Sequence, residues 1–268
     1  MVPQATQVIL GLLINAYRME VVMKLKGRVA VITGASRGLG REIARLYARA
    51  GARLVLVARG KSELEDVAQE LNTVTEVLPL AVDVSEESEW IAKAALSRFG
   101  QVDIIVNNAS SIGPSPMPRL EDYPWNELLS LFRINAVAPL HLIQLLLPQM
   151  VARREGVIIN VSSDAGVEAY PGWGGYGASK AALEHISRVL AKELDGSGVR
   201  VYVVDPGDMD TEMHRRAEPG IDLSHLPGPE YPAPAFVLLV EAESVPLGRF
   251  EASQIISSRV GDRWLTNP

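Results

Sequence analysis

The chain contains no cysteine. Disulfide bonds, thiolate catalysis and cysteine-ligated zinc are therefore excluded. Histidine, the other common zinc ligand, occurs only four times, and the spacings are not those of a metal site. We predict no bound metal and interpret these residues as surface or packing residues: His141, His185, His214 and His225.

The chain also lacks an excess of positive charge, with a formal net charge of −6 and a pI of about 5.4. Such a chain is poorly suited to bind a phosphate backbone, so we expect no nucleic-acid partner. Its 47% of hydrophobic and 22% of charged residues are typical of a globular protein rather than a disordered one. The absence of cysteine is consistent with a cytoplasmic location, which is the location we expect.

An apolar run near the N-terminus, Val8–Ile14, is too short to span a bilayer. No basic region precedes it and no small-residue cleavage site follows, which argues against a signal peptide. We predict no membrane span and interpret residues 1–23 as an extension. We expect the extension either to arise from an upstream start, since Met19 and Met23 are possible start positions, or to form a loosely packed arm. The alternative is that it serves as an interfacial anchor or an oligomer contact.

From residue 24 onwards, short apolar runs alternate with segments of helical periodicity. The expected strands are Arg28–Thr33, Arg53–Ala58, Val77–Val82, Val102–Val106, Val157–Val161, Val199–Val204 and Arg249–Ser253. The expected helices are Leu39–Ala50, Lys61–Leu71, Glu86–Phe99, Pro124–Arg153, Tyr176–Leu194 and Ala235–Ala242, with a kink or break at Pro139 or Pro148. Repeated βα units predict an α/β fold: one Rossmann-like domain over residues 24–268, with a doubly wound parallel sheet of about seven strands and helices on both faces.

A glycine-rich turn follows the first strand and opens a helix. Its residues are Thr33, Gly34, Ala35, Ser36, Arg37, Gly38, Leu39 and Gly40. Glycines let a backbone approach a pyrophosphate, and the free N–H groups and dipole of a helix N-terminus attract it. Because a strand precedes the turn and a helix follows it, the motif predicts a dinucleotide site rather than a merely tight turn.

The end of the second strand indicates which dinucleotide binds. A site for NAD carries Asp or Glu there to bind the ribose 2′-hydroxyl, whereas this chain has Ala58 and Arg59. Arg37 lies in the glycine-rich turn itself. Two guanidinium groups suit a 2′-phosphate, so the sequence favours NADP(H); the alternative is two solvated surface arginines.

Tyr176 and Lys180 stand four residues apart, so on a helix they share a face. A free tyrosine has a pKa near ~10, too high for proton exchange near neutrality. A neighbouring ammonium stabilises the phenolate and is expected to lower this pKa. The pair therefore makes chemical sense as an acid/base, although a buried tyrosine beside a surface lysine gives the same spacing.

These motifs and several others occur in an order that resembles the short-chain dehydrogenase/reductase family, in its compact single-domain branch. The resemblance runs from about residue 24 to about residue 211. Besides the glycine turn, it rests on Asp83-Val84, Asn107-Asn108-Ala109-Ser110, Asn135, Asn160-Val161-Ser162-Ser163, Tyr176 to Lys180, Pro206-Gly207 and Thr211. The family usually has glycine at the position of Ser110.

The resemblance implies a role for each matching residue. Asp83 and Val84 would bind the adenine, Asn108 and Ala109 would lie along its ribose, and Pro206, Gly207, Met209 and Thr211 would hold the nicotinamide carboxamide. Ser163 would hydrogen-bond the substrate oxygen, with Ser162 as the competing candidate. Asn135 would distort its helix and hold a water beside Lys180, which would complete a proton path from Tyr176. Tyr170 and Trp173 either line the substrate pocket or only pack.

The resemblance therefore implies an NADP(H)-dependent oxidoreductase acting on a small-molecule carbonyl or alcohol, with Tyr176 as acid/base. One alternative is a 3-oxoacyl-thioester reductase, for which Arg215 and Arg216 could supply a basic patch for an acyl carrier. A non-catalytic NADP(H)-binding sensor or scaffold is an alternative of another class. The tail from Gly248 to Ser253 departs from the family's tetramer-forming end, so we expect a homodimer through residues 124–153 and 176–194.

Overall fold

The computed structural model describes residues 24–242 and 248–260, so the predicted extension 1–23 lies outside the described residues. Within them, seven strands form one sheet in the order β3-β2-β1-β4-β5-β6-β7, and each neighbouring pair is parallel. The strands are β1 (Val29–Thr33), β2 (Arg53–Ala58), β3 (Val77–Ala81), β4 (Ile104–Asn107), β5 (Gly156–Val161), β6 (Val199–Asp205) and β7 (Gly248–Glu251). The predicted doubly wound sheet is confirmed.

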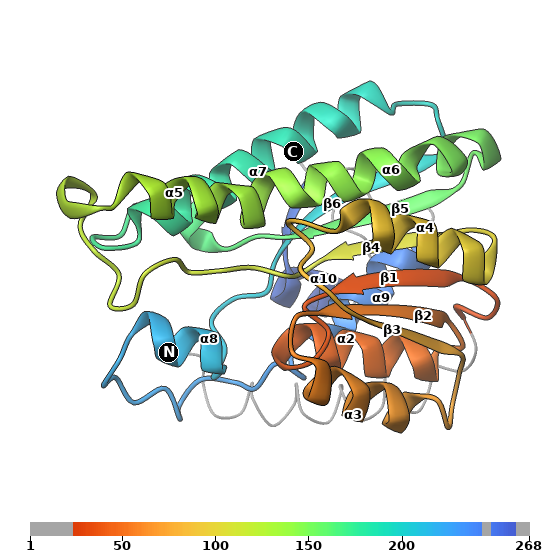
Figure 1. Cartoon of the computed structure of the whole chain (residues 1–268), viewed down its shortest axis with the longest axis horizontal. Helices are drawn as coiled ribbons and strands as arrows, with labels where there is room; N and C mark the ends of the chain where they lie inside the picture. The colour runs from red at the N-terminus through yellow and green to blue at the C-terminus, as the bar shows by residue number, and fades with distance from the viewer. Residues whose placement is uncertain (1–23, 243–247, 261–268) are drawn as a thin grey trace.

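Helices cover both faces of this sheet (Figure 1). One face is covered by α2 (Gly38–Arg49), α3 (Lys61–Leu71), α9 (Ala233–Glu241) and α10 (Ala252–Val260). The other is covered by α4 (Ser88–Phe99), α6 (Ala138–Arg153) and α7 (Gly174–Glu193). The remaining helical segments are η1 (Leu120–Asp122), α5 (Trp125–Phe132), η2 (Arg133–Val137), η3 (Asp164–Gly166) and α8 (Glu212–Ala217).

The strands read as unbroken apolar runs because both of their faces are buried. In β1, Ala30 and Ile32 point into the core under α2, whereas Val29 and Val31 point into the core under α4 and α6. Every residue of β1 is buried. The two cores hold the sheet rigid, so the loops at its carboxyl edge are held in fixed positions.

The long helix predicted over residues 124–153 is divided where a π-helical segment, η2, separates α5 from α6. The break falls just before Pro139, which lies in the first turn of α6, while Pro148 lies within α6. Asn135 is at the centre of η2 and is almost completely buried. The predicted distortion is confirmed, and its location places Asn135 toward the carboxyl edge of the sheet.

Several predicted boundaries differ from the observed ones by one or two residues, and two of these differences have a local cause. The helix expected from Glu86 begins at Ser88, because the Ser85 hydroxyl donates to Asp83 Oδ1 (2.7 Å) and extends the turn instead of capping a helix. The last strand ends at Glu251 instead of Ser253, since α10 begins at Ala252. Neither α8 nor α10 was expected from the sequence.

Chain order reverses between β1 and β4, which lie side by side although α2, β2, α3, β3 and α4 separate them in sequence. Ligands of open α/β sheets bind at such a switch point, outside the carboxyl ends of the strands. The glycine turn after β1 and the Asn108 segment after β4 both lie there. This is the edge at which the predicted site residues are to be sought.

Candidate active site at the carboxyl edge of the sheet

The three glycines of the turn after β1 are needed for different reasons. Gly34 has φ +67°, and a Cβ there would lie 2.7 Å from Asn108 Nδ2. A Cβ on Gly40 would lie 2.3 Å from the Gly34 carbonyl oxygen. Gly38 has φ +54° and faces open space, its nearest neighbour being Thr211 Cγ2 at 4.0 Å. Gly34 and Gly40 therefore permit close packing, and Gly38 leaves the N-terminus of α2 accessible to an anion.

The loops after β1 and β4 are fastened together by side-chain hydrogen bonds. Thr33 Oγ1 accepts from the backbone N–H groups of Asn108 (3.0 Å) and Ala109 (2.9 Å). In return, Asn108 Nδ2 donates to the carbonyls of Thr33 (2.9 Å) and Gly34 (3.2 Å). The predicted cofactor residues Asn108 and Ala109 thus define the floor beside the glycine turn.

The two arginines predicted to bind a 2′-phosphate are both exposed and both have carboxylate partners. Arg37 bonds Glu212 (2.5 Å), and the Arg37 side chain is 58% exposed. Arg59, 69% exposed, lies 3.8 Å from Asp83. Asp83 also accepts from the N–H and hydroxyl of Ser85, whereas Val84 is buried in the core instead of lying open. An exposed pair of this kind is weak, so either arginine can turn to a phosphate.

Tyr176 and Lys180 lie on one face of α7 and are both buried. Lys180 Nζ donates to the Val161 carbonyl (2.9 Å) and lies 5.5 Å from the centroid of the Tyr176 ring. Burial lowers the pKa of Lys180 to about 8, against the attraction of Glu184 and Asp205.

Burial likewise raises the pKa of the Tyr176 phenol above its usual range, and hydrogen bonds from Ser110 and Ser163 act in the opposite direction. The expectation that Lys180 brings this pKa below its ordinary value is therefore wrong for this arrangement. Removing the phenol from water disfavours the phenolate, and the same burial weakens the ammonium that would stabilise it.

The two candidate serines after β5 face different partners. Ser162 is buried and its hydroxyl donates to Glu184 Oε1 (2.6 Å). Ser163 instead lines the cavity beside Tyr176 and acts to lower the pKa of its phenol, and the Ser163 hydroxyl donates to Asp164 Oδ1 (3.0 Å). This geometry favours Ser163 over Ser162 as the partner of Tyr176.

Asn135 connects the loop after β4 with α7. Its Oδ1 accepts from Ser110 Oγ (3.1 Å) and from the Ser111 N–H (2.8 Å). Its Nδ2 donates to the Ser111 carbonyl (2.8 Å) and to Ser179 Oγ (2.9 Å), next to Lys180. Both polar atoms of the Asn135 side chain therefore bond the protein and hold the loop after β4 against α7. The water that Asn135 is expected to bind beside Lys180 stays a prediction.

The loop after β6 carries the residues predicted to hold the carboxamide. Gly207 has φ +74°, and its N–H donates to Asp205 Oδ1 (2.9 Å). Thr211 caps α8 by accepting from the His214 N–H (3.3 Å). Pro206, Gly207, Met209 and Thr211 all line one cavity of about 610 Å³, together with Ser163 and Tyr176.

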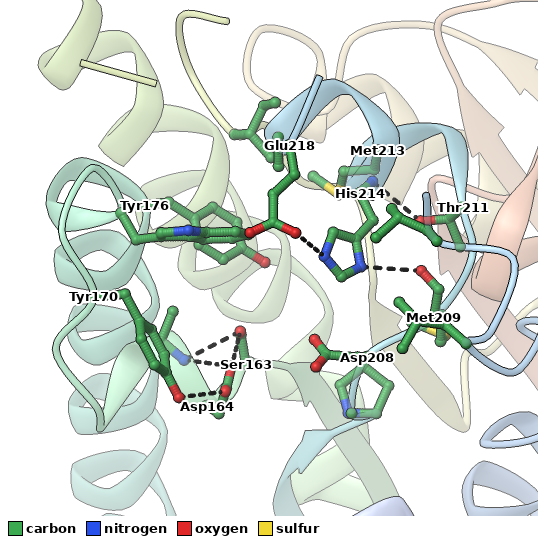
Figure 2. Close-up of a pocket in the computed structure, with 18 of the residues that line it drawn as sticks. Ser163, Asp164, Tyr170, Tyr176, Asp208, Met209, Thr211, Met213, His214 and Glu218 are labelled. Atoms are coloured by element: carbon green, nitrogen blue, oxygen red, sulfur yellow. Dashed lines mark hydrogen bonds and ion pairs between the residues drawn. The ribbon is translucent and has the colours of Figure 1, made fainter. Parts of the chain in front are cut away.

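Figure 2 shows this cavity, with Ser163, Asp164 and Tyr170 on one side of the opening and His214 and Met209 on the other. Tyr170 and Trp173 both line it, so the interpretation as pocket residues is the one that the structure supports. Trp173 also packs edge-on against Tyr176, with the ring centroids 5.7 Å apart.

Further polar residues that the sequence did not assign to the site lie there, among them Ser110, Asp164, His214 and Glu218. His214 and His225 also line the cavity, although His225 is exposed and His214 packs edge-on against Trp173, as expected of surface or packing residues. Only Ser110 carried a signal, its departure from the family's glycine. Within residues 24–242 and 248–260, no cluster of His, Asp or Glu is placed to hold a metal ion.

Comparisons with known proteins point in one direction. The family model described as short chain dehydrogenase matches residues 28–222. An oxidoreductase of Staphylococcus epidermidis is 38% identical over 190 residues, which cover 71% of this chain and 81% of the relative.

Solved structures agree. A short chain dehydrogenase from Pseudomonas syringae is similar with a TM-score of 0.80 and 31% identity, over 86% of this chain and 96% of that one. A metagenomic short-chain oxidoreductase in complex with NADP is similar with a TM-score of 0.73 and 33% identity, over 85% and 97% of the two chains.

Proposed function

The chain belongs to the short-chain dehydrogenase/reductase family, and on that premise we propose that it is an NADP(H)-dependent oxidoreductase that transfers a hydride between the nicotinamide and a carbonyl or secondary alcohol. The observation that carries the proposal is that Ser163 and Tyr176 line the same cavity, where the Ser163 hydroxyl acts to lower the pKa of the Tyr176 phenol, with Lys180 one helical turn further along α7. Such a pair can hold a carbonyl oxygen and deliver a proton to it.

The residues at the switch point fit a dinucleotide. Gly38 leaves open space at the N-terminus of α2, where backbone N–H groups and the helix dipole favour a pyrophosphate. The rest of this cofactor-binding turn would be formed by Gly34, Ser36, Leu39 and Gly40. When bound, the cofactor supplies the hydride.

We assign NADP(H) rather than NAD(H) because Arg59, not a carboxylate, follows β2. Arg37, in the glycine turn, and Arg59, after β2, are both exposed, and a 2′-phosphate on a bound cofactor would attract both. The metagenomic relative solved with NADP supports this assignment. Rates measured with NADPH and NADH side by side test it, and an equal or higher rate with NADH would contradict it.

In the reductive direction, the substrate oxygen lies between the hydroxyls of Ser163 and Tyr176. Tyr176 is protonated at neutral pH because its pKa is raised, and it donates that proton to the oxygen as negative charge develops. Ser163 hydrogen-bonds the same oxygen, for which its hydroxyl must turn away from Asp164. Lys180 holds a positive charge near the resulting phenolate.

The Tyr176→Phe variant tests this mechanism. It keeps the ring packed against Trp173 but has no proton to donate, so we expect NADPH binding by calorimetry to be unchanged. Turnover of a carbonyl substrate should fall at least ~100-fold, the usual contribution of a general acid. Tyr231→Phe, outside the cavity lining, is the matched control. Full activity of Tyr176→Phe would contradict the proposal.

The two alternatives make other predictions. A non-catalytic sensor or scaffold would bind NADPH without consuming it, whatever carbonyl is supplied. A 3-oxoacyl-thioester reductase would need a basic patch for its carrier, but Arg215 is paired with Asp210 (2.7 Å), and neither it nor Arg216 lines the cavity. No structural observation favours either alternative.

The proposed assembly is a cytoplasmic homodimer formed through α5, α6 and α7. Among the described helices, the continuous run Trp125–Arg153 is long and apolar enough to cross a membrane, although core helices pass the same test. Trp125 and Leu129 on α5 are 75% and 62% exposed. A second copy of the chain would cover this apolar surface.

A further inference from the structure

The side chains around the cavity carry acidic groups without a permanent cation to balance them. Four carboxylates line it: Asp164, Asp205, Asp208 and Glu218. None of the described lining residues is Lys or Arg. Asp205 is paired with Arg249 behind the wall (2.8 Å), which leaves three carboxylates to act on a ligand. A carboxylate or phosphate on the substrate would meet like charge in this cavity.

His214 and Glu218, one turn apart in sequence, form the acceptor pair of the cavity. His214 Nδ1 lies 3.1 Å from the Met209 carbonyl oxygen, which only accepts, so Nδ1 carries a proton. The other ring nitrogen, Nε2, lies 3.4 Å from Glu218 Oε2. In the neutral imidazole, Nε2 is an acceptor that faces an acceptor. A ligand group that donates hydrogen bonds would satisfy both atoms.

Protonation of His214 does not reverse this preference. The imidazolium would be neutralised by Glu218 at 3.4 Å, so the pair would carry no net positive charge for an anion. The His214 side chain is 15% exposed and is held by Met209 and by an edge-on contact with Trp173. Its orientation is therefore fixed before a ligand arrives.

Asp164 belongs to the opposite side of the opening (Figure 2). Its Oδ1 accepts from the Ala165 N–H (2.7 Å), and its Oδ2 accepts from the Tyr170 hydroxyl (2.9 Å). Both oxygens of Asp164 already accept hydrogen bonds from the protein. Asp164 therefore contributes negative charge to the cavity, and not a free hydrogen-bond acceptor for the ligand. The rest of the lining near α8 is apolar: Met213, Ala217, Ile221, Leu223 and Leu226.

We infer that the substrate is an apolar ketone, or the matching alcohol, which bears a hydrogen-bond donor for Glu218 and His214 and no anionic group. The inference rests on the proposed function and names the substrate class of the same site. The donor is a hydroxyl or an ammonium group. Glu218 is the specificity-determining residue, and carboxylate-bearing ketones are poor substrates.

Three ketones of similar size test this inference: acetophenone substituted in the para position with aminomethyl, hydroxymethyl or carboxylate. With NADPH, we expect kcat/KM for the first two to exceed that of the carboxylate at least ~10-fold, as like-charge repulsion in a partly buried site predicts. The ratio of kcat/KM for the donor-bearing ketones to kcat/KM for the carboxylate ketone should fall in the Glu218→Gln variant, mainly through changes in KM. In Glu218→Lys the carboxylate ketone should become the better substrate.

Glu193→Gln, an exposed substitution on α7, is the matched control and should keep the wild-type ratio. Equal or better reduction of the carboxylate ketone by the wild type, or an unchanged ratio in Glu218→Lys, would overturn the inference while the proposed function stands. If NADPH binds and none of the three ketones is reduced, the proposed function fails for this class. The inference is then tested by the affinity of the three ketones for the NADPH complex, measured by ligand-detected NMR. The aminomethyl and hydroxymethyl ketones should bind more tightly than the carboxylate.

Discussion

Ser110 contacts two residues to which the sequence assigns catalytic roles. Its hydroxyl donates to Asn135 Oδ1 (3.1 Å), and it also acts to lower the pKa of the Tyr176 phenol, for which its single proton must turn from Asn135 to the phenolate oxygen. The bond to Tyr176 lowers the phenol's pKa against the effect of burial. The hydroxyl that replaces the family's glycine therefore adds a second partner, besides Ser163, for the group that exchanges the proton.

Replacing Ser110 by glycine should move the pH dependence of alcohol oxidation, which needs the phenolate as proton acceptor. Loss of a hydrogen bond to the charged form raises the Tyr176 pKa, so the alkaline rise of kcat/KM should shift upward by about one pH unit, equivalent to ~1 kcal/mol. Ser110→Thr keeps a hydroxyl and should restore the profile. Identical profiles for wild type and Ser110→Gly would show that this bond does not act on Tyr176.

Lys180 should leave a signature in the stability of the protein. Its folded pKa is about 8, below the ordinary lysine value of 10.5, so between these values the unfolded state binds more protons than the folded state. Stability must then rise with pH across this window, by roughly 3–3.5 kcal/mol in all.

The measurement is chemical denaturation from pH 8 to pH 10, below the range in which Tyr176 would add an opposite slope. Lys180→Met should abolish the rise, whereas Lys192→Met, exposed on the same helix, should keep it. A rise of the same size in Lys180→Met would assign it to another group.

At the scale of the elements, one buried ionic cluster joins β5, α7, β6 and β7 beneath the site. Arg249 donates to Glu184 Oε1 (3.0 Å) and to Asp205 Oδ2 (2.8 Å). Ser162 donates to the same Glu184 oxygen (2.6 Å). Glu184 and Asp205 are 2% and 5% exposed, so Arg249 supplies the positive charge that keeps both carboxylates tolerable inside the protein. The short strand β7 is thereby tied to the catalytic helix.

Replacing Arg249 by methionine should lower the free energy of unfolding by about 3–5 kcal/mol, because two buried carboxylates lose their cation. Urea denaturation measures this change. The loss should shrink at lower pH, because burial raises the pKa of Asp205 and its carboxylate takes up a proton. Arg98→Met, which breaks the exposed pair with Glu76, should cost less than ~1 kcal/mol. Equal costs for the two variants would contradict the role given to the cluster.

At the scale of the whole molecule, α5 and α7 present apolar side chains that residues 24–242 and 248–260 do not cover. Trp125 and Leu129 are the most exposed of them on α5, and Val189 on α7 is 42% exposed. The continuous run from α5 to α6 also passes the test for a membrane-spanning helix. A second copy of the chain would bury this surface without a membrane.

The double substitution Trp125→Glu and Leu129→Glu should therefore convert a dimer into a monomer of 29.1 kDa in light scattering coupled to size-exclusion chromatography. Circular dichroism should show the fold unchanged, since both side chains lie outside the core. Trp90→Glu on α4, 52% exposed, is the control and should stay dimeric. A wild-type protein that runs as a monomer would refute the proposed assembly.

Local sequence patterns predict about seven parallel strands, the helices of the βα units, and the glycine turn. Each is encoded locally: buried strands read as apolar runs, helices as 3.6-residue periodicity, and the turn as positions without Cβ atoms. Helix and strand bounds such as those of α3 and β2 follow residue for residue. The order of the motifs indicated the family before any contact was known.

Only the tertiary structure decided which side chains meet at the site. Arg37 and Glu212 are 175 positions apart, and Ser110 reaches Tyr176 only because the loop after β4 packs against α7. Glu218 and His214 enter the cavity because α8 is positioned above the carboxyl edge of the sheet. Burial, which no local pattern measures, also set the direction of the Tyr176 pKa. Contacts between loops distant in the chain depend on how the sheet holds its carboxyl edge, so the reacting group was predicted from sequence and its surroundings were not.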